Sequence, residues 1–267
     1  MILIAGGTGR LGTAVVERLV ARDTRVRVLS RDFSHARFEG AVELVAGDVS
    51  NASSLRNALT GAETVVSAIT GFGPRGGGPR SVDQKGNFNL IEEAQAAGVK
   101  RFVLVSIYGA TANHTMELYR AKFAAEQRLR ESALDWTIVR PTVFLELWAG
   151  IVGGSLATGG VATVFGRGDN PINFVSVEEV ARCVELAAVD GRWPREVIDV
   201  GGPENLSLNR LVEILAADCG GKAKARHVPL NALRVGAALL RPIRPDLSGL
   251  MQAAVQMDVA KMSFDAR

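Results

Sequence analysis

Short apolar runs alternate with amphipathic segments through the first half of the chain. The runs are rich in Val, Ile and Leu, which is typical of strands covered on both faces of a parallel sheet. Between them, apolar residues recur at the three- and four-residue spacing of helices. This alternation favours parallel pairing through helical crossovers. The predicted strands lie at residues 2–4, 25–31, 41–45, 64–69, 101–106 and 135–141, and the predicted helices at 11–20, 52–59, 82–97 and 116–132.

A glycine-rich turn joins the first predicted strand to the first predicted helix. Glycine permits the tight turn, lets a pyrophosphate approach the backbone, and allows the helix to press close to the strand. An anion would bind the N–H groups at the positive end of the helix. The stretch predicts an α/β fold, a Rossmann-type doubly wound parallel sheet. A structural turn without a ligand is the alternative. The residues expected to contact the cofactor are Gly6, Thr8, Gly9, Arg10, Leu11 and Gly12.

An arginine stands at the exit of the second predicted strand, where NAD-binding folds place an acidic residue on the ribose 2′-hydroxyl. Arg31 presents a planar fork that suits a 2′-phosphate, and Arg10 could approach the phosphate from the glycine turn. We therefore expect NADP(H) to be preferred. NAD(H) stays possible because Asp32 is the next residue. The alternative role for Arg31 is that of a solvated surface residue.

The second half of the chain predicts a small, mainly helical substrate lobe. Helices are expected at 176–188 and 207–217, and apolar residues of 247–255 share one helical face. We expect residues 1–141 to form the dinucleotide-binding core and 142–267 the substrate-side segment and lobe. Residues 176–205 are expected to return to the core, and the two parts to pack as one unit.

Composition indicates an ordinary globular protein without a nucleic-acid or metal partner. The 267 residues carry a net charge of +3, with basic residues scattered rather than gathered in a stripe. Cys183 and Cys219 are isolated and are expected to be small buried residues. No cluster of metal-ligating residues occurs. The longest apolar stretch near the C-terminus, 235–240, is too short to span a bilayer, and no signal peptide precedes the first strand. We expect a cytoplasmic protein.

Five stretches of the sequence resemble the atypical short-chain dehydrogenase/reductase superfamily, in particular its NmrA-like and complex-I-subunit-like NAD(P)-binding branch. The resemblance covers roughly residues 1–220. It places an acidic residue after the third strand near the adenine, where Asp48 and Val49 stand; capping of the following helix is the alternative role of Asp48. The expected cofactor contacts also include Ala68, Lys122 and Pro141. The matching stretches are GGTGRLG (6–12), DQKGNFNLIEEAQAAGVKRFVLVS (83–106), YRAKFAAEQRLRESALDWTIVRPTVF (119–144), 174–181 and 197–203.

The sequence departs from the catalytic pattern of this superfamily at one position. The resemblance implies Tyr-x-x-x-Lys on the helix after the fifth strand, with a serine at the end of that strand. Lys122 and Ser106 match, but Leu118 replaces the tyrosine, and Tyr119 is rotated by about 100° on the helix. The candidate proton donors are therefore Tyr108, Lys122, Ser106 or a water. We expect Tyr119 to be a packed aromatic residue that does not reach the nicotinamide.

Two further segments are candidates for the substrate side. Residues 70–80 carry five glycines and leave the carboxyl edge of the sheet, so they could form a flap in which Arg75 or Arg80 binds an anion. A plain flexible connection is the alternative. After Pro141, Phe144, Leu147 and Trp148 could form an apolar wall of the pocket, or simply pack in a core.

Two functions follow from this sequence. The first is an NADPH-dependent reductase of a small, apolar carbonyl, enone or quinone-like substrate. The second is an NADP(H) sensor, regulator or assembly factor that keeps the fold without the chemistry, since fold alone does not decide function. A homo-oligomer or a protein partner is compatible with either function.

Overall fold

A computed structural model of the chain describes residues 1–34, 38, 42–73, 77–154, 156, 160–218 and 224–265. These residues form two compact units. Unit 1 contains Met1–Pro141 and Val177–Val200, and unit 2 contains Thr142–Ser176 and Gly201–Arg267. Two residues singled out in the sequence, Arg75 and Cys219, lie outside the described residues.

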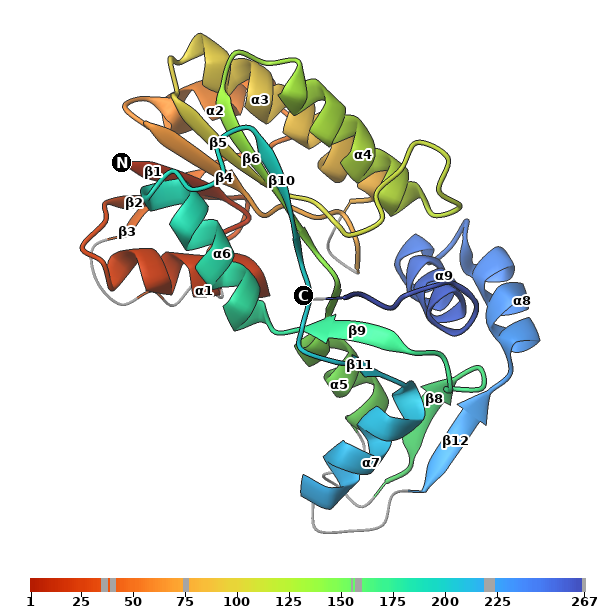
Figure 1. Ribbon diagram of the computed structural model, residues 1–267. Helices are drawn as coiled ribbons and strands as arrows, with labels where there is room; N and C mark the ends of the chain where they lie inside the picture. Colours follow the sequence, from red (N-terminus) through yellow and green to blue (C-terminus); the bar gives the residue numbers. More distant parts are fainter. Residues whose placement is uncertain are drawn as a thin grey trace. The chain divides into compact units, whose positions relative to one another are not determined.

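Unit 1 is built on a seven-stranded sheet whose paired strands are all parallel (Figure 1). The strand order is β10-β6-β5-β4-β1-β2-β3. The central strands are buried along their length, as the apolar runs predicted, whereas the edge strand β3 is largely exposed. The strands are β1 (Ile2–Ala5), β2 (Val26–Ser30), β3 (Val42–Ala46), β4 (Thr64–Ser67), β5 (Arg101–Val105), β6 (Asp135–Pro141) and β10 (Glu196–Val200).

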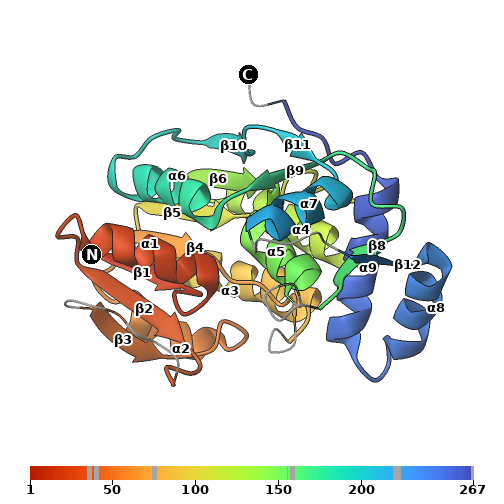
Figure 2. The same ribbon diagram turned by 90° about the horizontal axis from the view of Figure 1, so that it is seen from below.

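Helices cover both faces of this sheet (Figures 1 and 2). One face carries α1 (Arg10–Val20) and α6 (Val177–Val189), and the other carries α2 (Ala52–Leu59), α3 (Asn87–Ala96) and α4 (Glu117–Arg130). Beneath the second group, side chains of β5 and β6 pack against those of the helices in one buried cluster. The predicted Rossmann-type doubly wound sheet is therefore confirmed.

One predicted helix differs from expectation. The segment 82–97 is a π-helical turn, η1 (Arg80–Gly86), that continues as α3. The side-chain amide of Asn87 donates to the carbonyl oxygen of Asp83 at 2.7 Å. A regular helix would pair that carbonyl with the N–H of Asn87 itself, so the side chain displaces the α-helical bond. Hydrophobic spacing does not reveal such a substitution.

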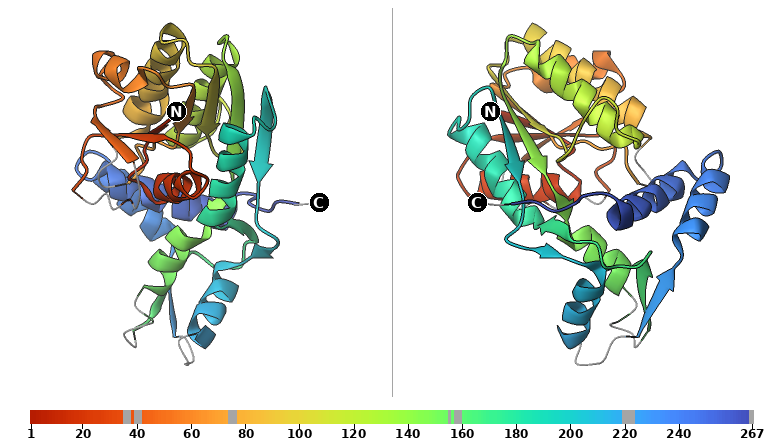
Figure 3. Two further views of the ribbon diagram at one scale, coloured as in Figure 1. Left: turned by 90° about the vertical axis from the view of Figure 1, so that its left-hand side faces the viewer. Right: turned by 45° about the vertical axis from the view of Figure 1, so that its right-hand side comes forward.

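Unit 2 combines helices with two small sheets (Figure 3). Its core contains side chains from α5, α7, α8 and α9 together with those of β8 and β9. The sequence predicted helices at 207–217 and 247–255 but did not predict α5. It did not predict the strands either, because two- to four-residue strands carry too few positions to show a period. The elements are β7 (Val143–Phe144), α5 (Leu145–Gly153), β8 (Ala162–Phe165), β9 (Ile172–Val175), β11 (Asn205–Leu206), α7 (Leu208–Asp218), β12 (Ala225–Val228), α8 (Leu230–Leu240) and α9 (Pro245–Val259).

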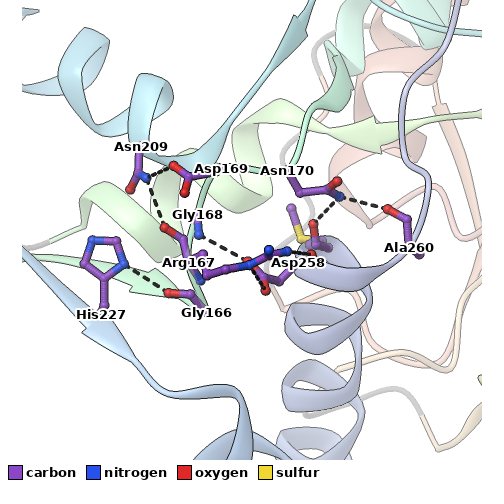
Figure 4. A network of polar contacts seen from close by, with 10 residues as sticks. Gly166, Arg167, Gly168, Asp169, Asn170, Asn209, His227, Asp258 and Ala260 are labelled. Atoms are coloured by element: carbon purple, nitrogen blue, oxygen red, sulfur yellow. Dashed lines mark hydrogen bonds and ion pairs between the residues drawn. The ribbon is translucent and has the colours of Figure 1, made fainter.

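A buried carboxylate ties the end of α9 to the turn between β8 and β9 (Figure 4). Asp258 Oδ1 accepts the backbone N–H groups of Arg167 at 2.9 Å and Gly168 at 3.2 Å. The amide of Asn170 donates to the carbonyl oxygens of Met257 and Ala260, at 2.7 and 2.8 Å. Every polar partner is satisfied within unit 2, so this network stabilises the unit rather than forming an open site.

Candidate functional site

The carboxyl ends of β1 and β4 meet where the strand order of the sheet reverses. In open α/β sheets this switch point is where ligands bind. Gly6 follows β1 with a φ of +83°, and a Cβ there would lie 2.7 Å from the carbonyl oxygen of Ala68, which follows β4. The N–H of Ala68 donates to the carbonyl of Ala5 at 2.9 Å. Only glycine allows the two strand ends to approach this closely.

The glycine turn has the form that a dinucleotide phosphate requires. A Cβ on Gly12 would lie 2.1 Å from the carbonyl oxygen of Gly6, so Gly12 permits α1 to pack on the turn. A Cβ on exposed Gly9 would meet only that same oxygen, at 3.3 Å. The helix has no side-chain cap at Gly9 and no acidic residue in its first turn. Its positive end is therefore left for an anion.

Arg31 and Asp32 follow β2, and the carboxylate of Asp32 is engaged within its own loop. Both carboxylate oxygens of Asp32 accept hydrogen bonds from Ser34, from its N–H at 2.8 Å and its hydroxyl at 2.9 Å. Arg31 is exposed next to it. The Ser50 N–H lowers the pKa of Asp48 below its ordinary value, and the positive charge of nearby Arg31 lowers it further.

The residues predicted to lie beside the adenine belong to a loop that hydrogen bonds hold in place. Asp48 accepts the N–H of Ser50 at 2.8 Å and does not cap α2. The N-cap is Asn51, whose side chain accepts the N–H of Ser53 at 3.2 Å. The carbonyl oxygen of Val49 accepts the side-chain amide of Asn89 at 2.9 Å. Thr8 and Ser30 share a hydrogen bond of 3.2 Å between their hydroxyls, which joins the glycine turn to the end of β2.

Lys122 is buried in α4 and has three protein oxygens close to its ammonium group. Its ammonium donates to the carbonyl oxygens of Ile69 at 2.8 Å and Val105 at 3.0 Å, which follow β4 and end β5. It also lies 3.1 Å from Oδ1 of buried Asp83. That contact is an ion pair without hydrogen-bond alignment, because Oδ1 has no aligned donor. An ammonium has three N–H donors, and two of them go to carbonyls.

Asp83 was not singled out in the sequence, although its carboxylate is fully buried near the sheet edge. Its Oδ2 accepts the N–H of Gly71 at 2.7 Å. Asn87, one turn later, accepts the hydroxyl of Ser67 at 2.6 Å. The π-helical turn thus fixes the segment that leaves β4. Within the predicted flap, the N–H of Gly78 donates to the carbonyl of Gly71 at 3.2 Å, and Arg80 is exposed at the start of η1.

A second buried carboxylate, that of Glu126, accepts a hydrogen bond from Ser106. The Ser106 hydroxyl donates to Glu126, whose side chain is fully buried on α4. Arg140 of β6 binds Glu126 through Nε at 2.8 Å and through a terminal nitrogen, and Arg130 adds a contact at 3.2 Å. The sequence did not predict this cluster. One signal was available, because Lys122 and Glu126 are four residues apart and share a helix face.

The two tyrosines of the chain, Tyr108 and Tyr119, have different surroundings. The N–H of Tyr108, on the loop after β5, donates to the carbonyl of Pro141 at 2.9 Å. Tyr119 stacks on His114 with ring centroids 3.9 Å apart, and burial raises the pKa of its hydroxyl. Tyr119 is thus a packed aromatic residue. Its distance from the nicotinamide stays a prediction.

The substrate-side candidates after Pro141 belong to unit 2. Trp148 is buried in the core of that unit and meets Phe165 edge to face at 6.1 Å. Phe144 is half-buried in β7, and Leu147 is exposed. Trp148 therefore packs in a core, which was the alternative considered for this segment. The contribution of Phe144 and Trp148 to a substrate pocket stays a prediction.

A family model described as NAD(P)H-binding matches residues 6–185, which include the glycine turn, the β1–β4 switch point and α4. The chain belongs to this NAD(P)H-binding family. The resemblance predicted from the sequence is thereby confirmed. Among the described residues of this NAD(P)H-binding protein, none of the helices has the length and apolar content needed to cross a bilayer. The described part also contains no group of three or more His, Cys, Asp or Glu residues that could hold a metal ion.

Relatives of this NAD(P)H-binding protein include both assembly factors and reductases. The chain is 29% identical to the photosystem II assembly factor Ycf39 of Synechocystis sp., over 87% of this chain and 72% of that protein. It is 28% identical to the NAD(P)H azoreductase of Xenophilus azovorans, over 82% of this chain and 74% of the relative. The crystal structure of an Escherichia coli NADPH-dependent quinone oxidoreductase with NADPH shares the fold, with a TM-score of 0.80 and 21% identity. That similarity covers 100% of this chain and 92% of the other.

Proposed function

We propose that this protein is an NADPH-dependent reductase of a small, apolar substrate carrying a carbonyl, enone, quinone or azo group. The observation that carries the proposal is the uncapped glycine turn at the β1–β4 switch point, followed by an arginine after β2. Asp32, the residue that would favour NAD(H), accepts hydrogen bonds from Ser34 with both of its carboxylate oxygens. The azoreductase relative supports reduction as the type of reaction.

The proposed cofactor site uses residues that fit its groups. The first turn of α1 with Gly9 would hold the pyrophosphate, and Arg31 with Arg10 the 2′-phosphate. Asp48 and Val49 would lie beside the adenine, and Ala68 and Pro141 would border the nicotinamide side. When bound, the cofactor supplies a hydride to the substrate. The protein then has to orient the substrate and deliver a proton.

We assign the proton to Tyr108 and positioning roles to Lys122 and Ser106. Lys122 already donates to two carbonyls and pairs with Asp83, and Ser106 donates its only proton to Glu126. Both side chains therefore fix the ends of β4 and β5 rather than offer a donor. Tyr108 follows on the loop after β5, at the edge of the sheet where ligands bind.

A rate assay tests this assignment. Purified protein is given NADPH with a panel of quinones, azo dyes and enones, and loss of NADPH absorbance is followed. Tyr108→Phe should lower turnover by about 10²-fold or more, the usual scale for a positioned proton donor. Tyr119→Phe is the matched control and should leave turnover nearly unchanged. A large loss in Tyr119→Phe alone would contradict the assignment.

A second function is favoured by the assembly-factor relative. In that case the fold binds NADP(H) as a regulator of a protein partner, and the engaged Lys122 and Ser106 are structural. Absence of turnover across the panel, together with NADPH-dependent affinity for a co-purified protein partner, would favour this function over the reductase.

A further inference from the structure

Helix α8 of unit 2 presents an apolar face to solvent. Leu233 and Ala237 bury the inner face, whereas Val235 and Leu239 are 59% and 69% exposed. These two residues are four apart and therefore share one side of the helix. Ile243, just beyond the helix, is 75% exposed. We call these three residues, Val235, Leu239 and Ile243, the α8 stripe. Large apolar side chains exposed side by side mark an interaction surface.

The α8 stripe is held on a rigid hairpin made with α9. A Cβ on Gly236 would lie 3.0 Å from the sulfur of Met251, so the two helices pack closely. The hydroxyl of Ser248 donates to the carbonyl of Ala237 at 2.7 Å. At the tip, the N–H groups of Ile243 and Arg244 donate to the carbonyl of Leu240, at 3.0 and 2.7 Å. These contacts therefore fix the backbone that carries the stripe.

A basic edge runs beside the stripe. Arg234 and Arg241 are seven residues apart, so they lie on the same side of the helix. Both are exposed, and neither forms an ion pair within the described part of the chain. By contrast, Arg244 pairs with Asp246 at 2.9 Å. The sequence from 224 to 245 contains no Asp or Glu. The surface thus combines exposed apolar side chains with uncompensated positive charge.

We propose that α8 docks on an anionic lipid bilayer, lying in the plane of the headgroups with the α8 stripe inserted. A helix with an apolar face and basic edges binds a membrane surface in this way. Arg234 and Arg241 would bind lipid phosphates, because anionic leaflets attract nearby arginines. A second copy of the chain fits less well, since it would bring the same unpaired arginines together. Two arginines and one short stripe give a reversible attachment. Unit 1 makes no contact with the bilayer in this proposal.

Vesicle flotation tests the proposal on the full chain. The probe is vesicles of phosphatidylcholine with phosphatidylglycerol, compared with phosphatidylcholine alone. The protein should float with the anionic vesicles, less so at high salt, and hardly with the neutral ones. The double variant Leu239→Ser, Ile243→Ser should lower the partition coefficient by roughly tenfold or more. Arg234→Gln with Arg241→Gln should lower it by a similar factor on anionic vesicles.

The matched control is Ile214→Ser, which removes an apolar side chain 40% exposed on α7 of the same unit. It should float like the wild type. Thermal unfolding identical to the wild type verifies that each variant is folded. Failure of the wild type to float on anionic vesicles at low salt overturns the proposal. So does flotation that the stripe variants leave unchanged. A dimer in sedimentation equilibrium that Leu239→Ser dissolves would instead make the stripe a contact between copies and also overturn it.

Discussion

Gly9 and Gly12 are the same residue type in one turn, yet the space around them differs. At Gly12 a side chain would collide with backbone only 2.1 Å away, whereas a Cβ at Gly9 would have one close neighbour, the carbonyl oxygen of Gly6 at 3.3 Å, which a shift of a few tenths of an ångström relieves. Backbone cannot move aside without shifting α1 from the sheet. Gly12 is thus required by the fold itself, and Gly9 by the proposed ligand.

This difference predicts two separable variants. Gly9→Val should abolish NADPH binding in calorimetry while costing less than about 1 kcal/mol of stability, since the residue is only a helix N-cap. Gly12→Ala should lower the unfolding midpoint markedly, because its Cβ overlaps the carbonyl of Gly6. Normal NADPH binding by Gly9→Val would mean that the pyrophosphate lies elsewhere.

The charge of Arg31 makes a prediction about cofactor choice. Arg31→Ala should weaken NADPH by about ten- to a hundredfold, the value of a lost charge-assisted hydrogen bond, and scarcely affect NADH. Calorimetry with each cofactor measures the ratio. Arg25→Ala, an exposed arginine at the opposite end of β2, is the matched control. Equal weakening of both cofactors would assign Arg31 to another role.

At the scale of elements, the start of α4 depends on a neutral histidine. Nδ1 of His114 accepts the N–H of Met116, the N-cap of α4, at 3.1 Å. Burial lowers the pKa of His114 below its ordinary value of 6.5, and the charge of Arg120 acts in the same direction. The folded state therefore favours the neutral ring more than the unfolded chain does. Its stabilising effect is present above the unfolded pKa and is lost as pH falls through the lower folded pKa.

The corresponding prediction concerns acid sensitivity. Between pH 7.5 and pH 5, wild-type protein should lose stability in part through His114, so His114→Asn should show a smaller drop of the unfolding midpoint over this range. Asparagine keeps an acceptor for the Met116 N–H but does not titrate. Midpoints measured in one series of buffers give the comparison. An identical drop in both proteins would show that other groups control the acid response.

The contact between α4 and η1 rests on the buried pair of Lys122 and Asp83. Removing one partner leaves an uncompensated buried charge, so Lys122→Met should cost about 3–5 kcal/mol. Asp83→Asn retains an acceptor for the Gly71 N–H, and the double variant should recover much of the loss. Urea unfolding of the four proteins gives the coupling, which we expect to exceed about 1 kcal/mol.

The same double variant separates two roles of Lys122. If the lysine acts by positioning the ends of β4 and β5, NADPH affinity should return together with stability. If it contacts the nicotinamide ribose directly, the stable double variant should still bind NADPH weakly. Calorimetry on the double variant therefore distinguishes structural from direct participation.

At the scale of the whole molecule, cofactor binding should stabilise one unit more than the other. A ligand at a hundred times its dissociation constant adds about 2.7 kcal/mol to the state that binds it. The proposed site lies within unit 1, so NADPH should raise the midpoint of that unit's transition by roughly 5–10 °C. Differential scanning calorimetry resolves the transitions. A shift confined to the other transition would place the cofactor in unit 2.

The sequence by itself determined six of the seven strands of the unit 1 sheet and the place of its glycine turn. Strand and helix periods are local properties, and each predicted strand of that sheet was found within a few residues. The glycines of 6–12 are also a local signal, because the turn they form is contained in seven residues. Apolar periodicity likewise indicated α7 and α9 of unit 2, where burial against neighbouring elements fixes one face of each helix.

Only the tertiary structure decided what the polar residues of the site are bound to. The partners of Lys122 include Ile69 and Asp83, which are distant in sequence. Glu126 binds Arg130 one turn along its own helix, but its other partners, Ser106 and Arg140, lie on other elements. Such pairs leave no period in the chain, since a buried charge is satisfied by whatever the fold brings to it. The π-helical turn arises in the same way, from the side chain of Asn87. Sequence thus indicated a candidate site, and long-range packing decided which of its side chains are already engaged.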